Sequence, residues 1–244
     1  MGCTGEQTDC NEDEMNVRRV YLDDYYISDI EIPQVLWTAV MGKSIRYYYQ
    51  NQTWGILRDR PIAAYVDAQV NLPVYCSYPM AYVSWNDAQE FCQKLSKITG
   101  KNYRLPTEAQ WEYAARGGKY ERMTKYSGSN YIDDVAYYGH EDGDRWAPVY
   151  LLTQNSRASN IINLHNMSGN VEEWCRDWYA EYDYTDTINP QGPVAPAGPD
   201  PTGRKVTRGG NWQSPAKDCR VSARSCSIPF WRMCFYGFRI VCEP

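Results

Sequence analysis

Residues 166–175 constrain the fold of this chain more than any other stretch, with the sequence Asn-Met-Ser-Gly-Asn-Val-Glu-Glu-Trp-Cys. The Ser-Gly-Asn step indicates a sharp turn, because glycine and asparagine tolerate positive φ. Such a turn can aim the backbone carbonyls of Gly169 and Val171 inward, beside the side-chain oxygens of Asn166 and Glu173. Hard oxygen ligands without His or Cys suit Ca²⁺ better than zinc. The stretch therefore predicts a structural calcium site.

The same stretch and two others resemble, in order, motifs of the formylglycine-generating enzyme (sulfatase-modifying factor) family. The three motifs are residues 169–174 (GNVEEW), residues 103–116 (YRLPTEAQWEYAAR), and the pair 208–212 and 237–239 (RGGNW, GFR). The resemblance covers nearly the whole chain. It implies an α+β fold of the C-type-lectin-like class, as a single irregular domain with short strands, two to three helices and long loops.

We accordingly predict one domain over residues 1–244, with an insertion at 44–78 and a proline- and glycine-rich surface loop at 185–204. Local signals predict helices at 33–41 and 84–98 and a third that opens at Thr107, because capping residues and apolar periodicity coincide there. Strands are expected at 20–30, 205–208, 218–224 and 238–242.

Charge and cysteine content bear on the compartment and the partners. The net charge of −5 argues against nucleic acid as the main partner. No apolar run is long enough to span a membrane. No signal peptide is visible, although Met1-Gly2 resembles a point inside a family motif, as expected of a trimmed chain. Nine cysteines favour an oxidising, extracytoplasmic or cell-surface location. The resemblance implies a bacterial or phage origin.

Two disulfides are expected. Cys3 and Cys10 lie close together in a polar N-terminal stretch, and their spacing suits a short disulfide. The resemblance implies that Cys92 is bridged to the C-terminal strand, where Cys242 is the nearest partner. The alternative is that most thiols are buried and reduced.

The resemblance also allows the copper-ligand positions of the family's enzymes to be compared with this sequence. Aerobic formylglycine-generating enzymes bind copper through two closely spaced cysteines shortly after a Gly-Gly step. Here Ser214 stands at the first of these positions after Gly209-Gly210, and only Cys219 remains. One thiolate cannot reproduce a two-thiolate copper(I) site. We therefore expect calcium but no copper, and a module without catalysis. The competing hypothesis is a divergent oxidase that acts on a cysteine or another thiol through Cys219.

Residues 225–236 (SCSIPFWRMCFY) carry the remaining functional signal, because they combine Trp, Phe, Met and Arg, which are enriched at interface cores. We predict a ligand face for a protein, peptide or cell-surface partner, made by Trp212, Ser225, Cys226, Ser227, Ile228, Phe230, Trp231, Met233, Cys234 and Phe235. Equally weighted is the alternative that half of these side chains point inward and complete the core.

Two further hypotheses about function come from members of the family that this chain resembles. Some are variable proteins of diversity-generating retroelements, which display diversified residues on this fold. Others are structural lipoproteins of bacterial surface assemblies. Both would use the domain for binding or assembly and not for catalysis.

Overall fold

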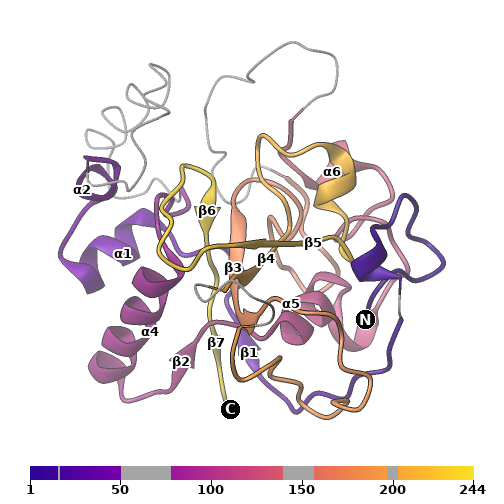
Figure 1. Cartoon of the computed structure of the whole chain (residues 1–244). Coiled ribbons are helices and arrows are strands. Elements are labelled where there is room, and N and C mark those ends of the chain that lie inside the picture. The colour runs from indigo at the N-terminus through magenta and orange to yellow at the C-terminus, as the bar shows by residue number, and fades with distance from the viewer. Residues whose placement is uncertain (16, 51–77, 140–156, 197–202) are drawn as a thin grey trace.

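The computed structural model describes residues 1–15, 17–50, 78–139, 157–196 and 203–244, which form one α+β domain built around two small sheets (Figure 1). The four-stranded sheet, called the longer sheet below, has the order β5-β4-β3-β6, and the three-stranded sheet has the order β1-β7-β2. Strand β6 runs parallel to β3, and the other pairs of neighbouring strands in these two sheets are antiparallel. The strands are β1 (Tyr26–Ile27), β2 (Tyr103–Arg104), β3 (Glu172–Trp178), β4 (Lys205–Arg208), β5 (Arg224–Ser227), β6 (Tyr236–Gly237) and β7 (Val241–Cys242).

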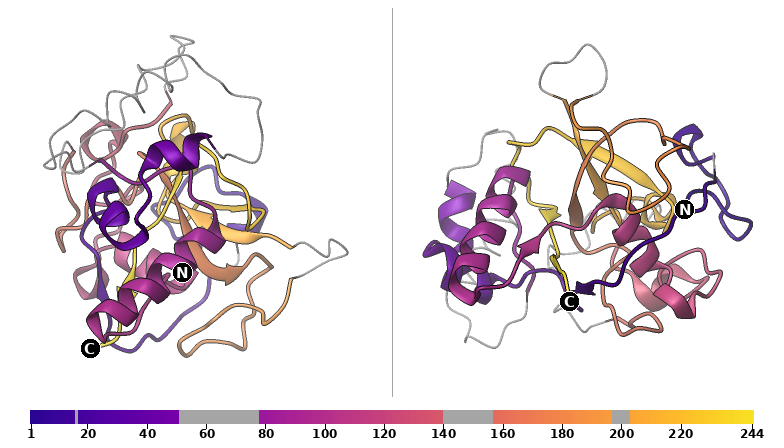
Figure 2. Two further views of the ribbon diagram at one scale, coloured as in Figure 1. Left: turned by 90° about the vertical axis from the view of Figure 1, so that its left-hand side faces the viewer. Right: turned by 90° about the horizontal axis from the view of Figure 1, so that it is seen from below.

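The helices gather on two sides of these sheets, with α1, α2 and α4 at one side and α5 and α6 at the other (Figures 1 and 2). The α-helices are α1 (Gln34–Met41), α2 (Ile45–Gln50), α4 (Trp85–Thr99), α5 (Glu108–Ala115) and α6 (Ile132–Val135). Short 3₁₀ turns occur at η1 (Glu12–Glu14), η2 (Gly118–Tyr120) and η3 (Ala216–Cys219). In the described part of the chain, no helix is long and apolar enough to cross a bilayer.

Capping residues set the bounds of the two best-predicted helices. Ser84 accepts a hydrogen bond from the Asp87 N–H at the start of α4, and Gly100 ends that helix with φ 75°. Thr107 and Gln110 form the reciprocal pair at the start of α5. These groups satisfy backbone N–H groups that have no partner inside the helix. Both predicted helices are confirmed.

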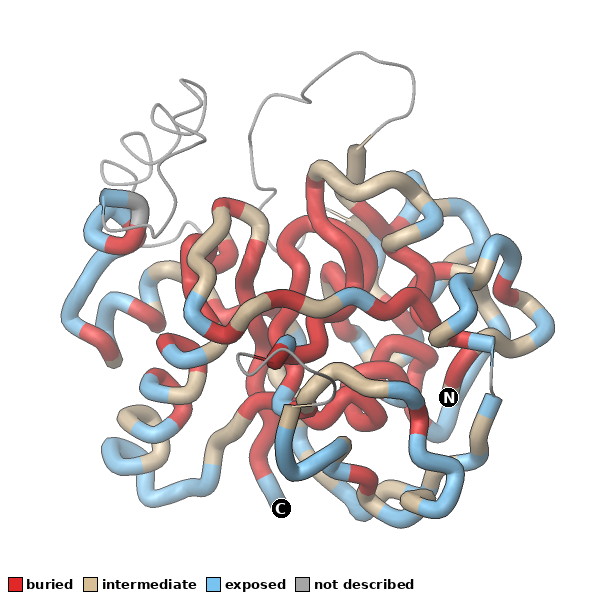
Figure 3. The backbone as a smooth tube through the Cα atoms, viewed as in Figure 1, coloured by how far each residue is buried: buried red, intermediate tan, exposed pale blue. Residues whose placement is uncertain are grey.

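Aromatic packing between α1, α4 and the C-terminal strand makes the larger core. The Trp37 ring stacks on Phe91 with centroids 5.3 Å apart, and Phe238 meets both rings edge-on. A second core, around Trp111 and Cys175, lies between α5 and the longer sheet. The buried backbone in Figure 3 follows these two cores through the centre of the molecule.

Several predicted elements are wrong in extent. Of residues 20–30, only Tyr26–Ile27 form a strand, although Tyr21 makes an isolated bridge to Ile188. Of residues 238–242, only Val241–Cys242 form a strand. Residues 218–223 belong to η3 and a turn, so the strand begins at Arg224. A run of β-prone residues forms a ladder only where a partner strand lies beside it. Residues 51–77, most of the predicted insertion, lie outside the described residues.

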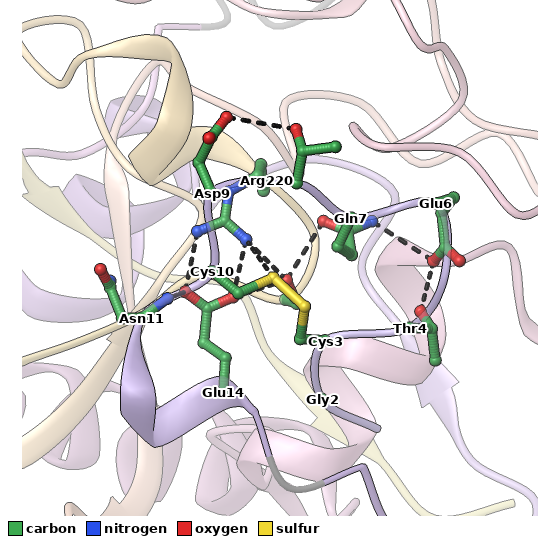
Figure 4. Close-up of a disulfide and its surroundings, with 12 residues drawn as sticks. Gly2, Cys3, Thr4, Glu6, Gln7, Asp9, Cys10, Asn11, Glu14 and Arg220 are labelled. Atoms are coloured by element: carbon green, nitrogen blue, oxygen red, sulfur yellow. Dashed lines mark hydrogen bonds and ion pairs between the residues drawn. A yellow bond between two sulfur atoms is a disulfide. The ribbon is translucent and has the colours of Figure 1, made fainter.

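The N-terminal disulfide is present. Cys3 and Cys10 are bonded with Cα atoms 6.2 Å apart, and the loop between them packs against the domain (Figure 4). In the same close-up Glu14 pairs with Arg220, whose Nη1 lies 2.7 Å from Glu14 Oε2. The second implied bridge is absent, because Cys92 in α4 and Cys242 in β7 are both free, buried thiols. Burial raises the pKa of the Cys92 thiol to about 12, which favours the protonated form.

Candidate functional site

The turn predicted from the sequence precedes β3. Asn166, Gly169 and Asn170 all have positive φ, at 57°, 77° and 65°. A Cβ on Gly169 would collide with the backbone of Tyr137, so glycine is required there for both its φ and its space. The turn reverses the chain immediately before Glu172, where β3 starts.

A glutamate that the sequence analysis did not select organises this turn. Glu31 Oε2 accepts hydrogen bonds from the side-chain amides of Asn166 (3.0 Å) and Asn170 (2.7 Å). Its Oε1 accepts one from the Val171 N–H (3.2 Å). Burial, and next the charge of Glu173, raise the pKa of Glu31 to about 8. One sequence feature could have identified Glu31: it is an acidic residue between two isoleucines, Ile30 and Ile32. An acid in such an apolar run is buried only when it has polar partners.

Glu173 is neutralised by an arginine. Its two carboxylate oxygens lie 2.7 Å from Nε and Nη2 of Arg239, which is a bidentate pair. The Trp111 indole N–H also donates to Glu173 Oε2, at 2.7 Å. Glu173 and Arg239 are both completely buried. Glu173, predicted as a calcium ligand, is buried at the centre of the fold, and the cation beside it in the structure is a guanidinium.

The oxygen atoms left in this turn decide whether calcium fits. A carboxylate has about four acceptor sites, so Glu173 keeps roughly one after its three hydrogen bonds. Asn170 Oδ1 is buried and has no hydrogen-bond partner. With the Asn166 side chain and the carbonyls of Gly169 and Val171, these oxygens make a donor set of the hard type that calcium prefers. The match to calcium is one of donor type, and Arg239 already contacts both oxygens of Glu173.

The copper site of the family's oxidases does not fit. Cys219 lies in η3 with its side chain fully buried, and burial raises the pKa of its thiol. Copper needs the thiolate, which this environment disfavours. At the position of the other cysteine, the Ser214 hydroxyl accepts a hydrogen bond from the Asn211 N–H. Among the described residues, no three His, Cys, Asp or Glu side chains cluster as metal ligands.

The predicted ligand face divides into outward and inward positions. Ser225 and Phe230 are exposed, Phe230 by 47%. Partly buried positions are Cys226, Ile228, Trp231, Met233 and Phe235, and buried ones are Ser227 and Cys234. Trp212 is only 3% exposed and belongs to the larger core, so its predicted place on an open face is wrong. Its backbone N–H donates to the Asn170 carbonyl, while its buried indole N–H has no hydrogen-bond partner.

An ion pair fastens this segment to the start of α4. Arg232 Nε and Nη2 lie 2.6 and 2.7 Å from the two oxygens of Asp87. Burial alone would raise the pKa of Asp87, but hydrogen bonds from Arg232 and Ser84 hold it below its ordinary value. The Tyr82 N–H also donates to the Met233 carbonyl. We call Arg232 with Asp87 the clamp; sequence analysis missed it because its two members are 145 residues apart.

Comparison with known proteins places the fold in a family. A family model for the sulfatase-modifying factor enzyme 1-like domain matches residues 2–244. The chain belongs to this family. It is 34% identical to the formylglycine-generating enzyme of Thermomonospora curvata over 69% of this chain, and 30% identical to the serine/threonine-protein kinase pkn1 of Chlamydia pneumoniae over 93%. It spans only 56% and 34% of those two proteins.

Solved structures agree with the single irregular α+β domain. Treponema denticola variable protein 1 superposes with a TM-score of 0.72 at 25% identity, over 100% of this chain and 94% of that one. PvdO from Pseudomonas aeruginosa has a TM-score of 0.67 at 21% identity, over 100% and 90%. The second likeness shows the fold alone. The family and fold predicted from the three motifs are confirmed.

Proposed function

We propose that this family domain is a non-catalytic binding module whose ligand face is the outward half of residues 225–235. The observation that carries the proposal is that this segment is tied to the domain by hydrogen bonds yet leaves one large apolar side chain, Phe230, exposed. The clamp and backbone hydrogen bonds fix its course, while Phe230 keeps 47% of its surface exposed. A pre-organised apolar surface loses little entropy when a protein or peptide binds.

The competing function, a divergent thiol oxidase, has less support. It would act through Cys219, but that thiol is buried and its pKa is raised by burial. The likeness to Treponema denticola variable protein 1 favours display of a variable surface instead. The Cys3–Cys10 bridge supports the expected oxidising, extracytoplasmic compartment.

One experiment separates binding from oxidation. The wild-type chain and Phe230→Ala are immobilised and exposed to surface proteins from the source cells, with Tyr120→Ala as the control. Tyr120 is 56% exposed in η2, outside the predicted face. We expect a partner that Phe230→Ala binds roughly tenfold or more weakly and Tyr120→Ala binds normally. Copper-dependent oxygen consumption with a cysteine peptide, stopped by Cys219→Ser, would refute the proposal.

The clamp should control the order of this face. In Arg232→Met, the Tyr82 amide should exchange at least about tenfold faster, and unfolding should cost roughly 1–3 kcal/mol less, because hydrogen bonds to a charged partner are lost. Lys94→Met is the matched control, since Lys94 makes an exposed pair with Glu90 in the same helix. Equal exchange rates in the two variants would contradict a positioning role.

The clamp also makes a pH prediction. The folded-state pKa of Asp87 lies below its ordinary value, so its contribution to stability is complete above the unfolded pKa. That contribution is lost as pH falls through the folded pKa. The difference in melting temperature between wild type and Arg232→Met should therefore shrink in strong acid. A difference that stays constant down to about pH 2 would count against the charged pair.

We also propose a structural calcium ion at the turn before β3, held by Asn166, Glu173 and the carbonyls of Gly169 and Val171. Calcium at about a hundred times its dissociation constant should stabilise the wild type by roughly 2.7 kcal/mol. Asn166→Ala should abolish this response. Asn163→Ala is the control, because Asn163 has a similar φ of 60° and is exposed. A melting temperature indifferent to both calcium and chelator would rule the ion out.

A further inference from the structure

A polar cavity lies at the end of β3, and Arg224, which precedes the first residue of the predicted ligand face, is part of its wall. Its volume is about 130 Å³, and it is enclosed by the N-terminal segment, the end of β3 and the chain that follows β3. Arg18, Asp177, Tyr182 and Gly192 contribute to its wall. Neither the family motifs nor the proposed binding function accounts for these side chains.

Two hydrogen-bond donors in this wall are unused. Tyr182 is only 8% exposed, and its buried hydroxyl has no hydrogen-bond partner. The buried Nε of Arg18 also has none, although Arg18 Nη1 donates to the Asp186 carbonyl at 3.2 Å. Buried polar atoms of native proteins are nearly always paired, with protein, water or ligand. Both residues line the cavity, so a polar ligand bound there is a candidate partner for these two donors.

A glycine keeps an acceptor open at the same cavity. Asp177 Oδ2 accepts the Glu108 N–H at 2.9 Å. A Cβ on Gly192 would lie 3.0 Å from the other oxygen, Oδ1, and 2.9 Å from the Asp177 Cβ. Gly192 also has φ +67°, which favours glycine. Only glycine at this position leaves Asp177 Oδ1 uncrowded.

Charges of both signs line the cavity: the carboxylates of Glu108, Asp177, Glu181, Asp183 and Asp186, and the guanidiniums of Arg18 and Arg224. Glu181, Asp183 and Asp186 line it and would repel an anion. Two cations already lie beside Tyr182: the guanidinium carbons of Arg224 and Arg18 are 4.0 and 4.7 Å from the centroid of its ring. A ligand cation would have to approach these two guanidiniums. The cavity suits a neutral molecule that both donates and accepts hydrogen bonds.

We propose that this cavity binds a small neutral polyol, such as a monosaccharide, through Asp177, Tyr182 and Arg18. One ligand hydroxyl donates to Asp177 Oδ1, and ligand oxygens accept from the Tyr182 hydroxyl and Arg18 Nε. Hydroxyl groups can fill both roles at once. Trp178, which also lines the cavity, supplies an apolar wall for the carbon skeleton. This site is independent of the ligand face at 225–235.

Titration of the full chain with D-glucose and with glycerol tests the site, with acetate and ethylammonium as charged probes of similar size. We expect saturable binding of at least one polyol, with Kd on the order of 1–10 mM, by isothermal calorimetry and by shifts of the Trp178 indole N–H in NMR spectra. Neither charged probe should saturate. Saturable binding of acetate or ethylammonium in place of the polyols would overturn the assignment.

Variants locate the site. Gly192→Ala should abolish polyol binding, while Gly5→Ala, where a Cβ meets nothing within 4 Å, should leave it unchanged. Tyr182→Phe removes one hydroxyl and should weaken binding roughly two- to tenfold without unfolding the chain. No saturable binding of either polyol, as for a cavity that holds only water, refutes the proposal. Binding that is equal in the wild type and Tyr182→Phe refutes it as well.

Discussion

Replacing Arg239 with methionine should remove about 3–5 kcal/mol from the free energy of unfolding. The reason is that the fully buried Glu173 carboxyl group would lose the guanidinium that now binds both of its oxygens. Glu31, also buried, adds a second carboxylate close by. Because a domain is stable by roughly 5–15 kcal/mol, the loss should be visible as a large fall in melting temperature.

Two further variants separate this effect from the general cost of changing an arginine. Arg176→Met is the matched control, because Arg176 is exposed and its side chain donates to Gln191; its effect should be within about 0.5 kcal/mol. The double variant Glu173→Leu with Arg239→Met should regain part of the stability, since no buried charge remains unpaired. If Arg239→Met melts like Arg176→Met, the pair does not stabilise the fold.

Local signals in the sequence predicted the helices well. The starts of α4 and α5 are each encoded by residues three positions apart, Ser84 with Asp87 and Thr107 with Gln110. The short strands were predicted poorly, because pairing depends on a neighbour brought close by the rest of the fold. Residues 20–30 look like a strand throughout, yet only Tyr26–Ile27 form one, against β7, while Tyr21 makes an isolated bridge to Ile188.

The candidate site shows the same limit. The turn at Gly169 was found because glycine and asparagine mark positive φ within a few residues. Glu31 was missed, since it meets Asn166 across 135 positions of sequence. The sequence also did not allow us to predict whether a given side chain points toward solvent or toward the core. Trp212 follows the turn at Gly209-Gly210, and no local rule says whether its indole faces solvent or the core.

Trp212→Ala should cost about 3–5 kcal/mol of stability, as expected for an aromatic side chain removed from a packed core. Phe230→Ala should cost less than about 1 kcal/mol, because nearly half of that side chain is already exposed. Trp212→Phe should recover most of the loss, since the buried indole N–H has no partner and phenylalanine removes that unpaired donor. Urea denaturation of the three variants measures these differences.

The contrast between the two aromatic residues decides which of them belongs to the ligand face. If Trp212→Ala folded with nearly normal stability but lost partner binding, Trp212 would be a ligand contact. In that case the core would have to close without it. If instead Phe230→Ala unfolded the chain, residues 225–235 would serve the core, and the proposed binding surface would lose its main apolar contact. The expected result is the reverse on both counts, because burial places Trp212 inside and Phe230 outside.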